Sequence, residues 1–248
     1  MDASLSISLS NQMALRRKMD VIANNLANLS TTGFKREIPL FEERPVNVSA
    51  RDAEGGERNL MLTYVEDWGT LRDMSDGQML KTGNPLDLGI AGDGFFQVQT
   101  PDGIRYTRNG AFTLDDTGRI VTSDGYPLLD DGGGEIVVDP TEGDLAVAKD
   151  GTLSNETGII GRIGLVTFDP TVELKKTGSS LFEADASPLP ADDASILQGT
   201  IERSNVEAVV EMTEMIEVMR AYQHSTDLIG TSEEMTRRAV QKLGEVRA

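Results

Sequence analysis

The sequence predicts an α+β protein: a central, mainly β domain of short antiparallel strands, flanked by N- and C-terminal α-helices that pack together as a helical bundle. Apolar residues recur with a helical period at both ends of the chain, and glycine-containing turn dipeptides recur every seven or eight residues in its middle. At 248 residues with 38% hydrophobic content, the chain is long enough for one large core or two modest ones.

The first predicted helix runs from about Ala3 to Leu29. Its apolar residues step by four and three along one side, which is the spacing of a heptad seam: Leu15, Met19, Ile22, Leu26 and Leu29. The same register meets Leu5, Ser8 and Gln12 upstream, so the seam is less apolar toward its beginning.

Three asparagines, Asn24, Asn25 and Asn28, lie in the last turns of this helix, and Gly33 follows them. Asparagine is unfavourable inside a helix because its amide competes for backbone hydrogen bonds. We expect these amides to bond something else, for which a neighbouring chain is one candidate. Gly33 is expected to reverse the chain after the helix, with Phe34 packing back on the last turn.

The middle of the chain carries Asp-Gly, Asn-Gly and Thr-Gly pairs between short segments rich in β-branched and aromatic residues, such as 104–107, 111–114 and 119–122. Such pairs favour turns that need a positive φ, so we predict a meander of short antiparallel strands. A buried strand is expected at 163–168. The interval 37–82 is less regular, with a strand at 60–65 and an exposed turn at 51–57.

The second predicted helix repeats the pattern of the first, again with spacings of four and three: Ala208, Met212, Met215, Met219, Tyr222, Thr226 and Ile229. Ser204 or Asn205 is its expected N-cap, and Glu207 lies in the first turn, where the helix dipole favours an anion. We expect four segments: 1–36 with the first helix, 37–82 as an extended connector with β segments, 83–198 as the central β domain, and 199–248 with the second helix.

Several stretches resemble the flagellar rod and hook proteins, the axial family of the bacterial flagellum. The N-terminal stretch holds Asn25, Leu26, Asn28, Thr31, Gly33 and Phe34. The other stretches are 83–96, 198–206 and 215–223. The modest length of the interval after the first helix favours the proximal-rod type over the longer distal-rod type or the much larger hook protein.

This resemblance implies a structural subunit of the basal-body rod in the periplasm, exported through the flagellar type III channel, transmitting torque and surrounding that channel. It implies that the terminal helices form an inner core and polymerise, with Leu15, Met19, Ile22, Leu29, Met212, Met215, Met219 and Tyr222 on the assembly helices. The implied partners are other copies of the chain and neighbouring rod proteins. Separately, burial of the seam residues offsets less than the entropy of ordering each helix, so both ends are expected to be mobile in the free subunit and to become ordered helices against neighbouring subunits.

Charge and composition exclude several other functions. Residues 37–200 hold 12 basic and 30 acidic side chains, which argues against a nucleic-acid partner because phosphates would be repelled. The chain has no cysteine and one histidine, His224, which leaves little for metal binding or for thiol or imidazole catalysis. No apolar run reaches the ~20 residues that span a bilayer. We expect no enzyme activity, cofactor, metal or small-molecule substrate.

Two alternatives from other functional classes stay open. Paired carboxylates would suit a glycoside hydrolase, but the acidic residues cluster in turns and the single Trp68 offers little surface for sugar stacking. A soluble β-rich binding module would explain the middle of the chain but not its helical ends. The first helix carries three basic residues, Arg16, Arg17 and Lys18, and the second carries a row of glutamates of opposite charge. These charges either steer the registry between the helices or are simply solvated.

Overall fold

A computed structural model describes residues 3–51, 57–139, 141, 143–169, 171–178 and 180–245. The chain divides into two compact units. The helical unit comprises Met1–Ala27, Arg36–Asp73 and Glu207–Ala248, and the β unit comprises Asn28–Lys35 and Met74–Val206. The chain therefore passes between the units four times, after residues 27, 35, 73 and 206.

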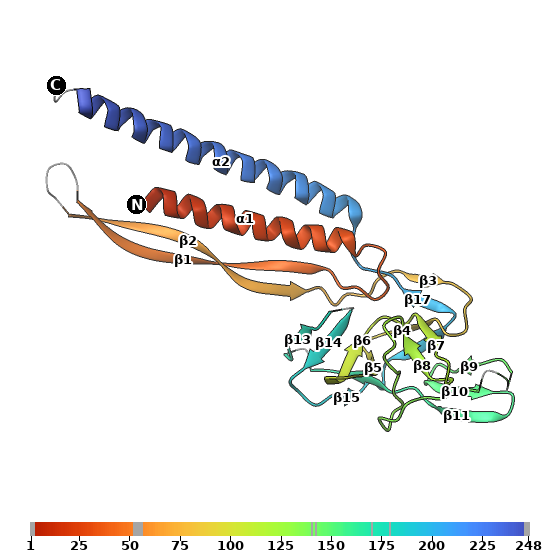
Figure 1. Cartoon of the computed structure of the whole chain (residues 1–248). Coiled ribbons are helices and arrows are strands. Elements are labelled where there is room, and N and C mark those ends of the chain that lie inside the picture. Colours follow the sequence, from red (N-terminus) through yellow and green to blue (C-terminus); the bar gives the residue numbers. More distant parts are fainter. Residues whose placement is uncertain are drawn as a thin grey trace. The chain divides into compact units, whose positions relative to one another are not determined.

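The helical unit contains helix α1, Ala3–Ala27, and the longer helix α2, Ala208–Glu245. They lie side by side and antiparallel (Figure 1), since Gln12 bonds Thr226 while Asn25, further along α1, bonds Glu211. The structure thus confirms the two terminal helices that the apolar spacing predicts. Helix α1 ends two residues before the predicted Leu29, where a turn begins with the bond from the Thr31 backbone N–H to the Asn28 carbonyl.

A long antiparallel hairpin packs along α1 in the same unit and is formed by β1, Glu37–Arg51, and β2, Glu57–Arg72 (Figure 1). The sequence predicts only a strand at 60–65 here, within what is the second strand of the hairpin. Both strands are edge strands, so Pro39 and Pro45 are tolerated in β1. The pairing shifts by one residue between Leu40 and Phe41, which leaves Trp68 without a paired residue opposite and exposed. Most of the predicted exposed turn lies outside the described residues.

Within its described residues, the β unit has fifteen short strands. These are β3 Met79–Lys81, β4 Leu88–Ala91, β5 Phe95–Thr100, β6 Gly103–Thr107, β7 Phe112–Leu114, β8 Ile120–Thr122, β9 Ala146–Val147, β10 Thr152–Asn155, β11 Gly158–Arg162, β12 Leu165–Thr167, β13 Leu174–Lys176, β14 Leu181–Ala184, β15 Leu189–Pro190, β16 Ser195–Gln198 and β17 Thr200–Glu202. The structure confirms the α+β class and the antiparallel pairing of these strands.

The predicted meander is correct for local hairpins only. Strands β5–β6, β7–β8 and β10–β11 pair as neighbours in sequence. The largest sheet, however, has the order β13-β14-β6-β5-β12-β15, so strands distant in sequence pair beside one another. Similarly, β16 pairs with β4 and β17 with β3. Turn spacing predicts hairpins but carries no information on these long-range pairings.

The core of the β unit lies on both faces of β5, as the alternation of its side chains requires. Phe96 and Val98 belong to a large buried cluster with Leu88, Phe112 and Leu128, whereas Phe95 belongs to a smaller cluster on the other face. The rings of Phe96 and Phe112 meet edge to face with centroids 5.2 Å apart. The segments of the β unit that come from the two ends of the chain, 28–35 and 199–206, form hydrogen bonds with residues around this core.

Acidic residues close many turns of the β unit. Asp115, Asp139, Asp150 and Asp169 each accept hydrogen bonds from the backbone N–H and the hydroxyl of the threonine two residues later. Such a side chain stabilises the turn that it begins. The acidity of the central segment is therefore partly turn chemistry, which is the interpretation that the glycine-flanked aspartates favour.

Candidate functional site

The inward face of α2 differs by one residue from the predicted seam. Met215, Tyr222 and Ile229 are half-buried, as the spacing predicts. The positions between them are taken by Glu211, Val218 and Ser225, which are buried, so the expectation that Met212, Met219 and Thr226 point inward is wrong. The error arises because two sets of heptad spacing overlap on this helix, and over residues 208–219 the exposed set is the more apolar one.

On α1 the predicted seam is the inward one. Ile22 is buried, and Leu15, Met19 and Leu26 are half-buried. Val21 and Asn25 complete this face. Leu29 lies beyond the end of the helix in the β unit, so its predicted place on the helical seam is wrong.

Each helix carries a second heptad row that stays exposed. On α2 this outer row begins with Val209, Met212, Ile216 and Met219, the last 55% exposed. On α1 the outer row is Leu9, Met13, Arg16, Asp20, Ala23 and Ala27. The α2 row is apolar at these four positions, whereas the α1 row is apolar at Leu9 and Met13 and carries Arg16 and Asp20 at its centre. Exposed apolar side chains at regular helical spacing are typical of helices that contact further helices. These two outer rows are the candidate assembly surfaces.

The amide of Asn25 is fully used within the helical unit. Its Oδ1 accepts from the Glu37 backbone N–H at 2.9 Å, and its Nδ2 donates to the Glu37 carbonyl at 2.8 Å and to Glu211 Oε2 at 3.2 Å. Arg36 donates to the other oxygen of Glu211, and this hydrogen bond raises the pKa of Arg36. Asn25, Arg36, Glu37 and Glu211 thus form a polar clamp that joins α1, β1 and α2.

The motif residues that follow α1, which are Asn28, Thr31, Gly33 and Phe34, lie in the β unit. Thr31 donates its hydroxyl to Asn28 Oδ1 at 3.2 Å. Gly33 has a φ of +67°, as a chain reversal requires, and a Cβ there would lie 2.5 Å from the carbonyl carbon of Arg108. Phe34 is buried, with Lys176 Nζ 4.4 Å from its ring centroid. Gly33 is therefore needed for close backbone approach as well as for the turn.

A second polar cluster surrounds Glu202. Lys35 Nζ donates to Glu202 Oε1 at 2.7 Å, and Arg108 Nη1 lies 3.4 Å from Glu202 Oε2. All three side chains are buried, and burial lowers the pKa of Lys35 while Glu202 partly offsets that effect. The sequence did not predict this cluster. Lys35 directly follows the N-terminal stretch that carries the family resemblance, and Glu202 lies in the stretch 198–206.

The helix caps differ from the prediction. Helix α2 begins at Ala208, and the Ser204 hydroxyl accepts from the Val206 backbone N–H instead of capping the helix. The Asn205 amide donates to the Ser75 carbonyl at 3.1 Å. Both side chains thus hold the segment that leads to α2.

Of the predicted charge contacts, Lys18 lies 3.9 Å from Glu214, while Arg17 pairs with Asp67 of the hairpin.

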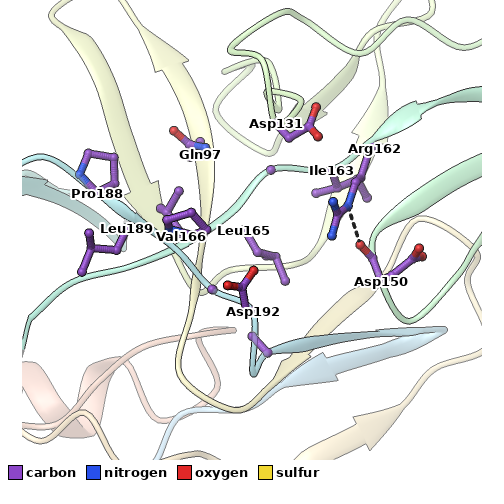
Figure 2. Close-up of a pocket in the computed structure, with 14 residues that line it drawn as sticks. Gln97, Asp131, Asp150, Arg162, Ile163, Leu165, Val166, Pro188, Leu189 and Asp192 are labelled. Atoms are coloured by element: carbon purple, nitrogen blue, oxygen red, sulfur yellow. Dashed lines mark hydrogen bonds between the residues drawn. The ribbon is translucent and has the colours of Figure 1, made fainter.

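The β unit also contains a pocket of about 530 Å³ beside β12 and β15 (Figure 2). Asp131, Asp150, Asp192 and Arg162 are its charged lining residues. Arg162 Nε donates to the Asp150 carbonyl at 2.9 Å, and the Asp150 carboxylate is bonded to Thr152 in a turn. These contacts hold the pocket wall together.

Three family models match the chain in the regions just described. They are "Flagella basal body rod protein" at residues 5–35, "Flagellar hook protein FlgE/F/G D1 domain" at 89–155 and "Flagellar basal body rod FlgEFG protein C-terminal" at 197–242. The flagellar basal-body rod protein FlgF of Caulobacter vibrioides is 42% identical over 99% of this chain and 100% of its own. The chain belongs to the flagellar basal-body rod protein family.

Other members of the rod protein family match over similar lengths. FlgF of Mesorhizobium japonicum is 35% identical over 98% of this chain and 99% of its own. FlgG of Bacillus subtilis is also 35% identical, over 96% of this chain and 97% of its own. The family is one of structural rod subunits. In the described residues, no helix has the length and apolar character to cross a membrane.

Proposed function

We propose that this chain is a non-enzymatic structural subunit of the proximal part of the flagellar basal-body rod, of the FlgF type. Its partners are further copies of itself and neighbouring rod proteins. The terminal helices line the inner, export-channel side of the rod and pass torque along it. The subunit reaches its place in the periplasm through the flagellar type III export channel.

One observation carries the assembly proposal. The helices α1 and α2 already pack on each other, yet each keeps an exposed heptad row, and the first four positions of the α2 row, Val209, Met212, Ile216 and Met219, are all apolar. Full burial of such a side chain is worth roughly 1.5–3 kcal/mol, and since Met212, Ile216 and Met219 are about half exposed, burying the rest of each would recover about half of that. Neighbouring helices in a polymer would recover that free energy.

Complementation of a deletion strain tests the assembly proposal. The double variant M212E/M219E is expected to abolish motility and rod assembly, because two carboxylates would enter an apolar interface. The control is Thr213→Glu, which places one such carboxylate on the neighbouring, polar side of α2. Normal motility of M212E/M219E, or equal loss in both variants, would contradict assembly through the outer row.

Identity to FlgF of C. vibrioides over the full length of both chains supports the proximal assignment over the distal one. Electron microscopy of basal bodies from the deletion strain tests it. Basal bodies that stop before the distal rod are expected. A complete rod in that strain would contradict a proximal position.

A further inference from the structure

The three buried charges around Glu202 lie where the chain enters and leaves the β unit. Lys35 is the last residue before one passage, Met74 the first after another, and Glu202 lies four residues before the last. The segments concerned are 28–35, 74–78 and 203–206. None of them contains a helix or a strand, so they have no ladder of hydrogen bonds of their own.

Their backbone groups are satisfied largely by one another. Gly33 N–H donates to the Glu202 carbonyl at 2.8 Å, and Arg203 N–H donates to the Gln78 carbonyl at 3.0 Å. Gly77 N–H donates to Glu202 Oε1 at 2.9 Å. A Cβ on Gly77 would lie 1.8 Å from the Arg203 carbonyl oxygen, so the two segments are in direct backbone contact.

The side chains close the same set of contacts. Lys35 Nζ donates to the Ser75 carbonyl at 2.7 Å, to the Met74 carbonyl at 3.3 Å and to Glu202. All three ammonium protons thus have an acceptor on a segment other than that of Lys35, and the acceptor on Glu202 is fully buried. Arg108 follows β6 directly, donates to the carbonyl of Gly92 between β4 and β5, and supplies the second cation for Glu202. Asp76, 3.6 Å from Arg108 and half-exposed, balances the charge.

We propose that Lys35, Glu202 and Arg108 form a buried ionic latch through which the segments 28–35, 74–78 and 203–206 become ordered together or not at all. Removing one buried partner leaves another charge uncompensated, which is the costly way to break such a pair. The latch therefore makes ordering of the N-terminal passage depend on the C-terminal one, although the two lie far apart in sequence. It is independent of the proposed function, because it is a property of the isolated chain.

Native-state hydrogen exchange on the full-length wild-type protein tests the latch without any variant. The amides of Gly33, Gly77 and Arg203 are expected to share one opening free energy and one denaturant dependence, below those of the core amide of Val98. Distinct opening free energies among the three amides would overturn the proposal. Opening of all three only together with Val98 would also overturn it, since the latch would then be no separate unit.

Substitutions of the charged latch residues test the same coupling between the three segments. Glu202→Gln keeps an acceptor oxygen but removes the charge, and is expected to speed exchange at Gly33 and Gly77 at least tenfold while Val98 is unchanged. Lys35→Met is expected to speed exchange at Arg203 by a similar factor. The double variant K35M/E202Q should show less acceleration than the product of the single effects, because it removes one cation and one anion together.

Asp76→Asn is the matched control, since it removes a half-exposed charge from the edge of the same cluster. It is expected to change exchange at Gly33 and Arg203 less than about twofold. Acceleration confined to the altered segment, multiplicative effects in K35M/E202Q, or an effect of Asp76→Asn equal to that of Glu202→Gln would each overturn the latch. Should Glu202→Gln fail to fold, Lys35→Met and the wild-type experiment still decide.

Discussion

At the scale of single residues, the asparagine–glycine motif joins chain segments within the subunit. Asn25 is 1% exposed, and both of its amide protons and its carbonyl oxygen are bonded inside the helical unit. An amide satisfied in this way needs no partner from a neighbouring chain. The helix propensity lost at Asn25 is offset by the contacts that fix β1 and α2 beside α1.

Replacing Asn25 by alanine is expected to destabilise the folded chain by about 2–4 kcal/mol. Alanine gains ~0.7 kcal/mol of helix propensity, but the Glu37 backbone groups and Glu211 lose buried partners. Asn24→Ala is the matched control, because Asn24 is the exposed neighbour on the same helix. Urea unfolding followed by circular dichroism measures both. Equal stability of the two variants would show that the clamp contributes nothing.

Gly33→Ala is expected to destabilise the protein clearly more than Gly125→Ala. Both glycines have a positive φ, which costs an alanine of order 1–3 kcal/mol. Only at Gly33 would the new methyl also meet backbone, that of Arg108 and Asn109, whereas at Gly125 the space is open. The difference in urea midpoint between the variants isolates the close approach, and no difference would contradict it.

At the scale of elements, the sequence predicts both helices and the local hairpins because these depend on the spacing of apolar and turn residues that are close together in the chain. It fails where the outcome depends on distant partners. The choice between the overlapping heptad rows of α2 is made by Asn25 and Arg36, which draw Glu211 inward and so bury Val218 instead of Met219. The order of the six-stranded sheet and the pairing of Lys35 with Glu202 likewise have no local signal.

The neighbours Val218 and Met219 separate folding from assembly. Val218→Ala is expected to lower the stability of the purified subunit by about 1–3 kcal/mol, because two buried methyl groups are lost. Met219→Ala is expected to leave that stability unchanged within ~0.5 kcal/mol and to weaken polymerisation instead. Thermal unfolding and pelleting of polymers measure the two effects. A reversed pattern would contradict the observed register of α2.

The acidic turns predict a pH dependence of stability. Hydrogen bonds from the threonine hydroxyls lower the pKa of Asp115, Asp139 and Asp169, and the Thr152 backbone N–H lowers the pKa of Asp150. A carboxyl group whose pKa is lower in the folded state than in the unfolded state stabilises the folded state at pH values above its unfolded-state pKa, which is near 4. This stabilisation is lost as the pH falls below that value. Urea midpoints should therefore drop between about pH 4 and pH 2.

Asp115→Asn provides the control for this acid limb. Asparagine can close the same turn through its amide oxygen but does not titrate in this range. The variant is expected to lose less stability than the wild type between pH 4 and pH 2. An unchanged acid limb would show that the carboxylate of Asp115 has no part in it.

At the scale of the whole molecule, each unit contains a buried polar cluster. Residues close in sequence to the passages between the units contribute to both clusters. Asn25, Arg36 and Glu211 serve the helical unit, and Lys35, Glu202 and Arg108 serve the β unit. The buried polar groups of these clusters bond within the chain, while the outer rows of α1 and α2 stay exposed. Under the proposed assembly, contacts between subunits are therefore expected to involve apolar side chains of these rows rather than the two polar clusters.

Because the chain has no cysteine, Met219→Cys creates a single thiol on the outer row of α2. The rate of maleimide labelling of this thiol, compared between the free subunit and isolated basal bodies, tests the central claim directly. The account predicts rapid labelling of the free subunit and strong protection in the rod. Equally rapid labelling in both would contradict assembly through the outer helix rows.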